Sequence, residues 1–232
     1  MPPVDSGIAV VLVSGGMDSA VSASIAASTR SAAGLAFLHV EYGQRTQARE
    51  RASFDALADH FKAGRRLVAR LDHLRSIGGS SLVDRSIAVP VADLSAKEIP
   101  STYVPFRNGQ LLSVAAAWAE SLGSHAIYIG AVQEDSSGYP DCRREFFDAF
   151  EAAIASGTKP GARVAIETPV IGLRKSQIVR RGLELGTPLE LTWSCYQSGQ
   201  EACGACDSCA LRLRAFAEAG VADPIRYAAH AG

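Results

Sequence analysis

The sequence lacks an excess of charge of either sign. Its 232 residues carry 23 lysines and arginines against 24 aspartates and glutamates, a formal net charge of −1. A protein whose main task is to hold tRNA or an anionic membrane usually has a basic surface, and this chain has no overall attraction to either. We therefore expect small-molecule ligands, with no nucleic-acid and no membrane partner.

The sequence also lacks a long apolar run. The first run, residues 8–13, is too short to cross a bilayer, and no basic segment precedes it as in a signal peptide. These absences predict a cytoplasmic protein. In that compartment cysteines stay reduced unless they bind metal or take part in redox chemistry.

Cysteine is scarce, but four of the five cysteines lie within residues 195–209. Two residues separate Cys203 from Cys206 and Cys206 from Cys209, and seven separate Cys195 from Cys203. The two-residue spacing lets thiolates converge on one ion, and four thiolates complete a closed tetrahedral zinc site. We predict structural Zn²⁺ at these four positions. An iron–sulfur cluster and a redox disulfide are the alternatives, although the Cys-Pro pair of the ferredoxin motif is missing. The remaining Cys142 is interpreted as a small packing residue.

What the sequence does have is a strand-to-helix turn near its start. The apolar run 8–13 predicts a buried strand and the small-residue run 20–27 predicts a helix, joined by Ser14-Gly15-Gly16-Met17-Asp18-Ser19. Paired glycines let the backbone approach a ligand closely, and the start of a helix favours bound phosphate. Ser14 and Ser19 add hydroxyl donors, while Asp18 can bind Mg²⁺ or fix the turn.

Neither of the two common phosphate-binding motifs is present in this turn. The Walker Gly-Lys-Ser/Thr is absent, and so is the Gly-x-Gly-x-x-Gly of dinucleotide sites. The turn instead resembles the loop of the ATP-pyrophosphatase superfamily, whose members cleave ATP between its α- and β-phosphates and adenylate a substrate. An ordinary Gly-Gly turn capped by Ser and Asp is the alternative. The predicted nucleotide-binding residues are Val13, Ser14, Gly15, Gly16, Met17, Asp18, Ser19, Ala20 and Val21.

Predicted strands and helices alternate along the chain. Strands are expected at residues 8–13, 34–40, 66–71, 126–130 and 163–168, with helices between them. This order predicts an α/β fold with a doubly wound, mainly parallel five-stranded sheet and helices on both faces. In such sheets ligands bind at the carboxyl ends of the strands, where the 14–19 turn and the 41–45 loop both fall.

Two units are expected. Residues 1–190 would form a nucleotide-binding α/β domain, and residues 191–232 a small zinc knuckle with a C-terminal helix packed on it. Weak periodicity and several Gly and Pro breakers over residues 72–108 indicate an irregular insertion, which is a lid, a partner surface or a mobile surface loop. The residues after Pro224 are predicted to form a tail.

Two predicted helices begin next to cations. Arg107 and Asn108 precede the helix 110–121, where they can cap it or meet an anion. Arg174 and Lys175 lie at the start of another helix, where a cation opposes the helix dipole. Either an anion is bound near them or they form a solvated basic face.

A polar loop follows the fourth predicted strand. Residues 133–143 contain three carboxylates, an aromatic ring and an arginine, a mixture suited to a polar ligand. The alternative is a turn in which Asp141 caps the helix 143–155.

Together these segments resemble the 7-cyano-7-deazaguanine synthase family of the queuosine pathway. The match rests on residues 14–19, 41–45, 101–108, 137–143 and the four C-terminal cysteines. The chain departs from the family where Met17 replaces a frequent Gln, where Phe106 replaces a frequent Gly, and at Arg174-Lys175-Ser176, where Lys-Ala-Glu is common. The resemblance implies an adenine nucleotide α-hydrolase-like fold, ATP as co-substrate, Mg²⁺, structural Zn²⁺ and a homodimer.

The same resemblance implies a reaction. A ligase would convert 7-carboxy-7-deazaguanine and ammonia to 7-cyano-7-deazaguanine through adenylated intermediates, releasing AMP and pyrophosphate. It implies catalytic roles for Asp18, Asp135 and Lys175, and substrate binding by Arg107, Asn108, Tyr139, Asp141 and Arg143. Of these, Tyr139 is expected to stack on the deazapurine, while Asp135 or Asp141 reads its N–H edge.

Other classes of protein carry some of the same features. A related adenylating amidotransferase or a tRNA thiolase would share the loop, but the near-zero charge and the closed cysteine spacing weigh against the thiolase. A non-enzymatic zinc-knuckle protein would use residues 195–209 to bind RNA or a partner.

Overall fold

The computed structural model describes residues 7–95, 98–133 and 138–228. Its centre is a five-stranded sheet in the order β3-β2-β1-β4-β5, and every neighbouring pair of strands is parallel. The strands are β1 (Ala9–Leu12), β2 (Leu35–Glu41), β3 (Arg65–Arg70), β4 (Ala126–Ile129) and β5 (Ala165–Glu167). The predicted parallel α/β sheet is confirmed.

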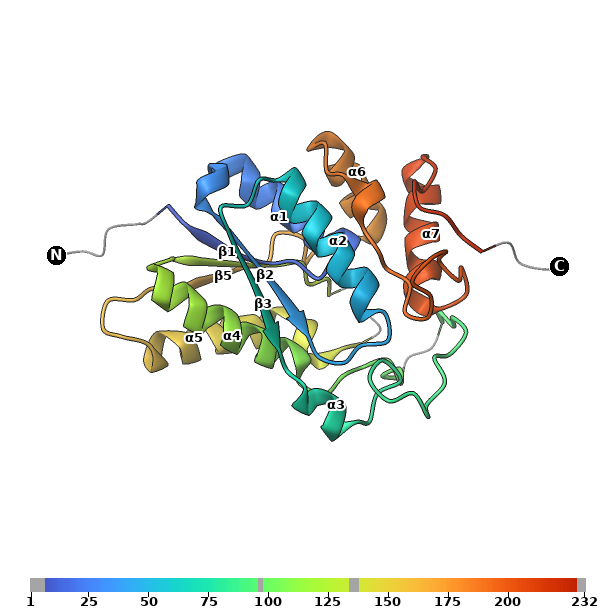
Figure 1. Cartoon of the computed structure of the whole chain (residues 1–232), viewed down its shortest axis with the longest axis horizontal. Helices are drawn as coiled ribbons and strands as arrows, with labels where there is room; N and C mark the ends of the chain where they lie inside the picture. The colour runs from blue at the N-terminus through green and yellow to red at the C-terminus, as the bar shows by residue number, and fades with distance from the viewer. Residues whose placement is uncertain (1–6, 96–97, 134–137, 229–232) are drawn as a thin grey trace.

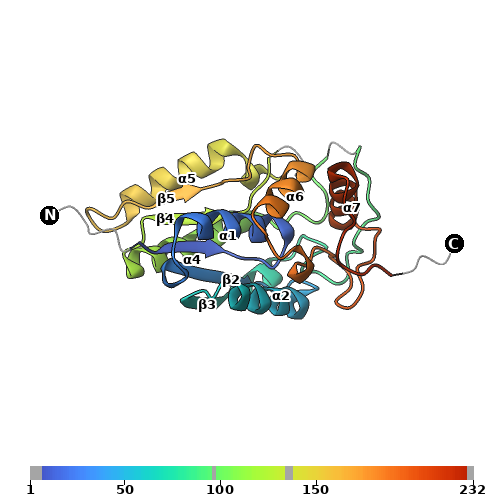
Figure 2. The same cartoon turned by 90° about the horizontal axis from the view of Figure 1, so that it is seen from above.

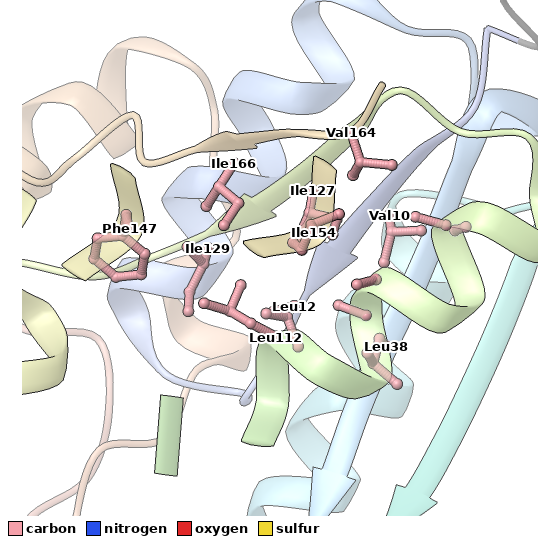
Figure 3. Close-up of a cluster of buried hydrophobic side chains, with 14 of the residues drawn as sticks. Val10, Leu12, Leu38, Leu112, Ile127, Ile129, Phe147, Ile154, Val164 and Ile166 are labelled. Atoms are coloured by element: carbon pink, nitrogen blue, oxygen red, sulfur yellow. The ribbon is translucent and has the colours of Figure 1, made fainter. Parts of the chain in front are cut away.

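Side-chain alternation along the strands explains why helices cover both faces. Val10 and Leu12 pack on one face with α4 (Arg107–Leu122) and α5 (Arg144–Gly157), the cluster drawn in Figure 3. Val11 and Val13 point to the other face, where α1 (Met17–Thr29) and α2 (Gln47–His60) cover them. Because successive residues of a strand face opposite sides, an unbroken apolar strand needs both layers of helix. Figure 1 shows these two layers above and below the sheet.

The remaining helices gather at one end of the sheet. Helix α6 (Lys175–Glu184) packs on α1, and α7 (Asp207–Ala219) packs on α6. Both lie beyond the strand ends in Figures 1 and 2. Three short 3₁₀ turns complete the elements: η1 (Ala32–Gly34), η2 (Pro140–Cys142) and η3 (Leu189–Leu191). None of the helices in the described part of the chain has the length and hydropathy of a transmembrane segment.

The described part of the insertion 72–108 is packed against the body of the protein over residues 74–87 and at Val104. It begins with α3 (His73–Ile77), and its apolar side chains form a small core with Tyr42: Leu74, Leu82, Val83 and Val104. The Arg45 guanidinium donates to three of its carbonyls, those of Ser81 (2.6 Å), Asp84 (3.0 Å) and Ile87 (2.6 Å). Arg45 therefore holds the backbone of residues 81–87 in place, although this segment has little sequence periodicity.

The prediction of a C-terminal tail after Pro224 is wrong for residues 226–228. The Ala202 amide donates to the Arg226 carbonyl and the Ala228 amide to the Ala202 carbonyl, both at 2.9 Å, so this segment pairs with the chain between the first two clustered cysteines. The physical reason is a buried ion pair just upstream, Arg212 with Asp223, which fixes the chain as it leaves α7. Sequence periodicity carries no signal for such a pair.

Candidate active site

A cavity of about 280 Å³ lies at the carboxyl ends of β1, β2 and β4. This volume is close to the lower end of small-molecule sites, about 300 Å³. Its walls come from distant parts of the chain: the end of β1 with most of the 14–19 loop, residues 44–46, the start of α4, residues 129–132, and the segment around the first clustered cysteine, which contributes Trp193, Ser194 and Tyr196. Ligand binding at this edge is what a parallel sheet of this type predicts.

The 14–19 loop is a tight turn pressed between other elements. Gly15 has φ +91°, and a Cβ there would lie 2.7 Å from the Glu50 carbonyl oxygen of α2. A Cβ on Gly130 would lie 2.7 Å from the backbone of Asp18. Only glycine fits these two positions, because a side chain would collide with backbone at both, and at Gly15 the left-handed φ also disfavours any other residue.

The hydroxyls of the loop are arranged around the start of α1. The Ser19 hydroxyl donates to the Gly16 carbonyl (2.8 Å), and the Ser14 hydroxyl accepts from the Gly16 amide (3.2 Å). Gly16 is the N-cap residue of α1 and has no side chain to cap it. Gly16, Met17, Asp18 and Ser19 line the cavity at the start of this 13-residue helix, and the start of a helix is where phosphate oxygens bind in other proteins.

The structure places the predicted nucleotide-binding residues in two groups. Those that line the cavity are Val13, Ser14, Gly16, Met17, Asp18 and Ser19. Ala20 and Val21 are fully buried and pack in the cores on either side of α1. Gly15 does not line the cavity and shapes the loop instead.

Asp18 and Lys175 form an ion pair in the wall of the cavity. The Lys175 ammonium lies 2.5 Å from Asp18 Oδ2, and both side chains are largely buried. The other carboxylate oxygen, Oδ1, is buried without a hydrogen-bond partner. A carboxylate oxygen left free in this way is a ligand atom of the kind Mg²⁺ prefers, so the residues fit a bound cation.

Arg107 supplies positive charge to another part of the cavity. Its Nη1 donates to the Tyr42 hydroxyl at 2.9 Å, and the guanidinium lies 5.5 Å from the centroid of the Tyr42 ring. Burial raises the pKa of Tyr42, so the phenol is neutral and does not cancel the charge. Within the described residues, no carboxylate forms an ion pair with Arg107. An anionic ligand group is therefore the natural partner of Arg107.

Asn108 and Asp141 form a buried network behind the cavity wall. Asp141 Oδ2 accepts from the Asn108 backbone amide at 2.9 Å, and the Asn108 side chain donates to the Asp141 carbonyl (2.8 Å) and to Cys142 Sγ (3.3 Å). Asp141 thus caps the start of α4, not the helix that follows it in sequence. Burial raises the pKa of the Asp141 carboxyl and raises that of the Cys142 thiol to about 11.

The other predicted substrate residues fall in different places. Tyr139 is buried and lines the cavity, with its hydroxyl 2.8 Å from Thr102 Oγ1 and its ring 5.3 Å from that of Tyr103. Arg143 is an exposed N-cap of α5 and does not line the cavity. Asp135 lies outside the described residues.

Phe106 has an unusual backbone conformation directly beside Arg107. Its φ is +53°, in the left-handed region, and its ring covers Gly109 on the first turn of α4 and meets Phe146 edge to face. Such a φ costs roughly 1–3 kcal/mol for a residue with a side chain. Glycine would adopt this conformation without the cost.

Several cavity residues were not expected from the sequence. Tyr42, Trp193, Ser194, Tyr196 and Arg212 all line the cavity. Tyr42 belongs to the 41–45 loop, whose place after a strand is a usable signal. Trp193, Ser194 and Tyr196 lie close to Cys195 in the sequence, and Arg212 lies on α7. These residues reach the cavity only because the C-terminal segment folds against the edge of the sheet.

The four cysteines come together as the spacing predicted. Their sulfur atoms all lie within 4.8 Å of one another, and Cys203 Sγ is 3.9 Å from Cys209 Sγ. Four thiolates at roughly 2.3 Å from one zinc are spaced by about 3.8 Å, so the group fits the metal. Backbone amides of Gln197, Ser198 and Cys203 point at Cys195 Sγ from 3.3–3.4 Å. Hydrogen bonds from the neighbouring thiols and from these amides hold the pKa of Cys195 well below its usual range.

Comparison with protein families gives one match over most of the chain. The model of the family "Queuosine biosynthesis protein QueC" matches residues 8–220. The 7-cyano-7-deazaguanine synthase of Chlorobium phaeobacteroides is 58% identical over 221 residues, covering 94% of this chain and 96% of that protein. The synthases of Chloroherpeton thalassium and Koribacter versatilis are 56% and 55% identical, with 94% and 97% of this chain and 96% and 94% of those proteins covered.

Solved structures give weaker similarity. The NMN synthetase of Francisella tularensis has a TM-score of 0.46 and 18% identity, over 83% of this chain and 67% of that one. A 4-thiouridine synthetase in complex with RNA and ATP has a TM-score of 0.46 and 20% identity, over 78% and 41% of the respective chains. Neither score is high enough to carry a conclusion about function.

Proposed function

The chain belongs to the QueC family of queuosine biosynthesis proteins, and on that basis we propose that it acts as an ATP-dependent 7-cyano-7-deazaguanine synthase. The observation that carries this proposal is the identity of 55–58% with named synthases over almost the whole of both chains. The cavity at the sheet edge supplies groups suited to each part of the reaction.

The proposed reaction has two activations by ATP. The carboxylate of 7-carboxy-7-deazaguanine attacks the α-phosphorus, a P–O bond forms and pyrophosphate leaves. Ammonia then displaces AMP from the acyl adenylate and gives the amide. The amide oxygen attacks a second ATP in the same way, and loss of this oxygen with AMP and of two protons leaves the nitrile.

We assign the leaving pyrophosphate to the 14–19 loop. The amides at the start of α1 and the hydroxyls of Ser14 and Ser19 surround this end of the cavity. These groups are fixed by folding, so they do not have to reorient to stabilise the charge that develops on the leaving oxygen. Such electrostatic stabilisation is usually the largest single contribution to catalysis. The glycine contacts at positions 15 and 130 hold the loop in place for this purpose.

Asp18 and Lys175 are assigned to the same phosphates. Lys175 places its charge beside the loop while its ion pair with Asp18 fixes its position, and Asp18 keeps one buried oxygen for a cation. Mg²⁺, when bound there, supplies charge neutralisation for the pyrophosphate. Asp135 remains a predicted catalytic residue on the basis of the family resemblance alone.

We assign the deazaguanine to the opposite part of the cavity. Arg107 offers an uncancelled positive charge to the carboxylate, and Tyr139 offers an aromatic ring. Asn108 lines the wall, while the Asp141 carboxylate is engaged with the backbone of α4 and supports that wall from behind. Arg143 would need a movement of its exposed side chain to take part.

We further propose structural zinc, a homodimer and a cytoplasmic location. Zinc is supported by four converging thiols with no open position. A dimer is supported by large exposed apolar side chains on the insertion, Ile77, Val91, Leu94 and Ile99. Reduced cysteines support the cytoplasm.

The function is tested by incubating the protein with ATP, Mg²⁺, ammonium and 7-carboxy-7-deazaguanine. We expect AMP, pyrophosphate and the nitrile, with no AMP when the deazaguanine is left out. Formation of ADP and phosphate would contradict the chemistry assigned to the loop. AMP without nitrile would mean that the adenylating site is correct and the acceptor is another compound.

A further inference from the structure

The 14–19 loop is attached to the C-terminal segment by one backbone hydrogen bond. The Trp193 amide donates to the Gly15 carbonyl at 2.8 Å. A carbonyl and the amide of the next residue share one rigid peptide plane and point in opposite directions. Holding the Gly15 carbonyl therefore fixes the direction of the Gly16 N–H, which lies on the ligand side of the loop next to Ser14.

Trp193 is itself held in place from several sides. The Arg49 guanidinium lies 4.6 Å from its ring, and its indole N–H donates to the Ser198 carbonyl at 3.0 Å. Its main chain is fixed through both neighbours in sequence. Arg212 Nη1 donates to the hydroxyl of Thr192 at 2.7 Å and to that of Ser194 at 3.3 Å.

Arg212 is buried and rigid. Its side chain is 2% exposed, and it makes a two-pronged ion pair with Asp223 through Nε (2.7 Å) and Nη2 (2.9 Å). Asp223 also accepts from the Tyr227 hydroxyl at 2.7 Å. A paired guanidinium of this kind has a fixed geometry. Its third nitrogen therefore holds Thr192 and Ser194 at defined points.

We propose that Arg212 is a positioning residue for the ATP site. By holding Thr192 and Ser194 on both sides of Trp193, it keeps the Trp193 amide on the Gly15 carbonyl and the 14–19 loop in its ligand-binding conformation. This inference rests on the proposed function only in taking ATP as the ligand of the loop. It gives the C-terminal segment a role in binding ATP besides carrying the cysteine cluster.

The first test measures the dissociation constant of ATP with Mg²⁺ by calorimetry. Thr192→Val removes the hydroxyl that Arg212 holds and keeps the shape of the side chain. We expect it to weaken ATP binding about tenfold, within the usual range of coupling between sites. Thr192→Ser, which restores the hydroxyl, should return the affinity to that of the wild type. Affinity for 7-carboxy-7-deazaguanine should not change in either variant.

A matched control separates this role from general support of α7. Arg180 of α6 donates to the Glu218 carbonyl of α7 at 2.7 Å but has no contact with residues 192–194. Arg180→Met should leave ATP affinity unchanged. If Thr192→Val lowers the melting temperature and leaves ATP affinity unchanged, Arg212 is purely structural and the proposal is wrong.

A second measurement covers the case in which Thr192→Val does not fold. In Trp118→Phe protein, Trp193 is the remaining tryptophan of the two in the chain. ATP with Mg²⁺ should change its fluorescence, and unchanged fluorescence at a concentration where calorimetry shows binding would overturn the proposal. A protein that shows this coupling to ATP but makes no nitrile would instead refute the proposed function.

Discussion

The buried or half-buried cations of the cavity differ in what neutralises them. Lys175 is paired with Asp18, and Arg212 is paired with Asp223. Arg45 donates to backbone carbonyls of the insertion, and Arg107 donates to the neutral phenol of Tyr42 and forms no ion pair with a carboxylate in the described part of the chain. The site therefore keeps positive charge for a ligand at Arg107, while the charges of Lys175 and Arg212 are fixed in position by carboxylates.

Lys175 provides the first prediction at the scale of a single residue. Lys175→Met removes the charge beside the 14–19 loop, and we expect the rate of AMP formation to fall by about 10²–10³, as when a fixed electrostatic contact of the transition state is lost. Single-turnover assays with radiolabelled ATP measure this rate. Arg174→Ala is the matched control, because Arg174 is exposed at the start of the same helix. An equal loss in both variants would point to the helix and not to the ammonium.

His39 provides a prediction about pH. It is buried in β2, its Nδ1 lies 3.0 Å from the Val13 carbonyl, and burial lowers its pKa below the usual 6.5. In the unfolded chain His39 has a pKa near 6.5, and in the folded protein its pKa is lower. Between these two pH values the unfolded chain binds a proton and the folded protein does not, so the free energy of unfolding falls as the pH falls. Urea titrations over this range measure it.

His39→Asn is the comparison for that prediction, because its amide can donate to the same carbonyl and does not titrate. The variant should be less stable than wild type near pH 8, and the difference should shrink as pH falls below 6.5. A difference that stays constant across this range would show that His39 does not have a lowered pKa.

At the scale of elements, the loop after β1 and the cysteine-bearing segment before α7 form one structure. Gly15 is in contact with α2 on one side and hydrogen-bonded to Trp193 on the other. Trp193, Ser194 and Tyr196 then form part of the cavity wall, and the first clustered cysteine, Cys195, lies between the last two. We therefore expect that a change which disorders the cysteine cluster will also disorder the 14–19 loop, and that the reverse will hold.

Replacing one clustered cysteine tests the assignment of zinc to this cluster and its contribution to stability. Cys206→Ala should reduce bound zinc from one equivalent to none, measured by mass spectrometry of the metal, and destabilise the protein by about 4 kcal/mol or more. Cys142→Ala is the control, because Cys142 is a buried cysteine outside the cluster and should leave the zinc content unchanged. Iron in place of zinc in the wild-type protein would contradict the assignment of the metal.

At the scale of the whole molecule, the cavity that we propose as the active site is assembled at one end of the sheet. The insertion, the start of α4, α6 and the C-terminal segment all meet beyond the strand ends, as Figures 1 and 2 show. The opposite end of the sheet does not contribute to the cavity. The insertion also carries the exposed apolar side chains that favour association.

Light scattering tests the dimer. The wild-type protein should have twice the mass of one chain, and Val91→Asp with Ile99→Asp should give a monomer, because a charge on these exposed positions would have to be buried in the interface. Leu183→Asp on α6 is the control, since Leu183 is also exposed but lies away from the insertion. A wild-type monomer at micromolar concentration would refute the proposed dimer.

The sequence by itself determined the parallel sheet, the 14–19 loop at its edge and the convergence of the four cysteines. These features depend on short-range patterns: apolar runs, paired glycines and two-residue cysteine spacing. Only the tertiary structure decided that Asp141 caps α4, that residues 226–228 pair with Ala202, and that Trp193 and Arg212 reach the cavity. Each of these depends on a hydrogen bond or ion pair between residues that have no common periodicity. A buried arginine needs a carboxylate partner, because an unpaired charge away from water is costly. Which carboxylate becomes that partner depends on how the chain folds, and no local sequence pattern predicts it.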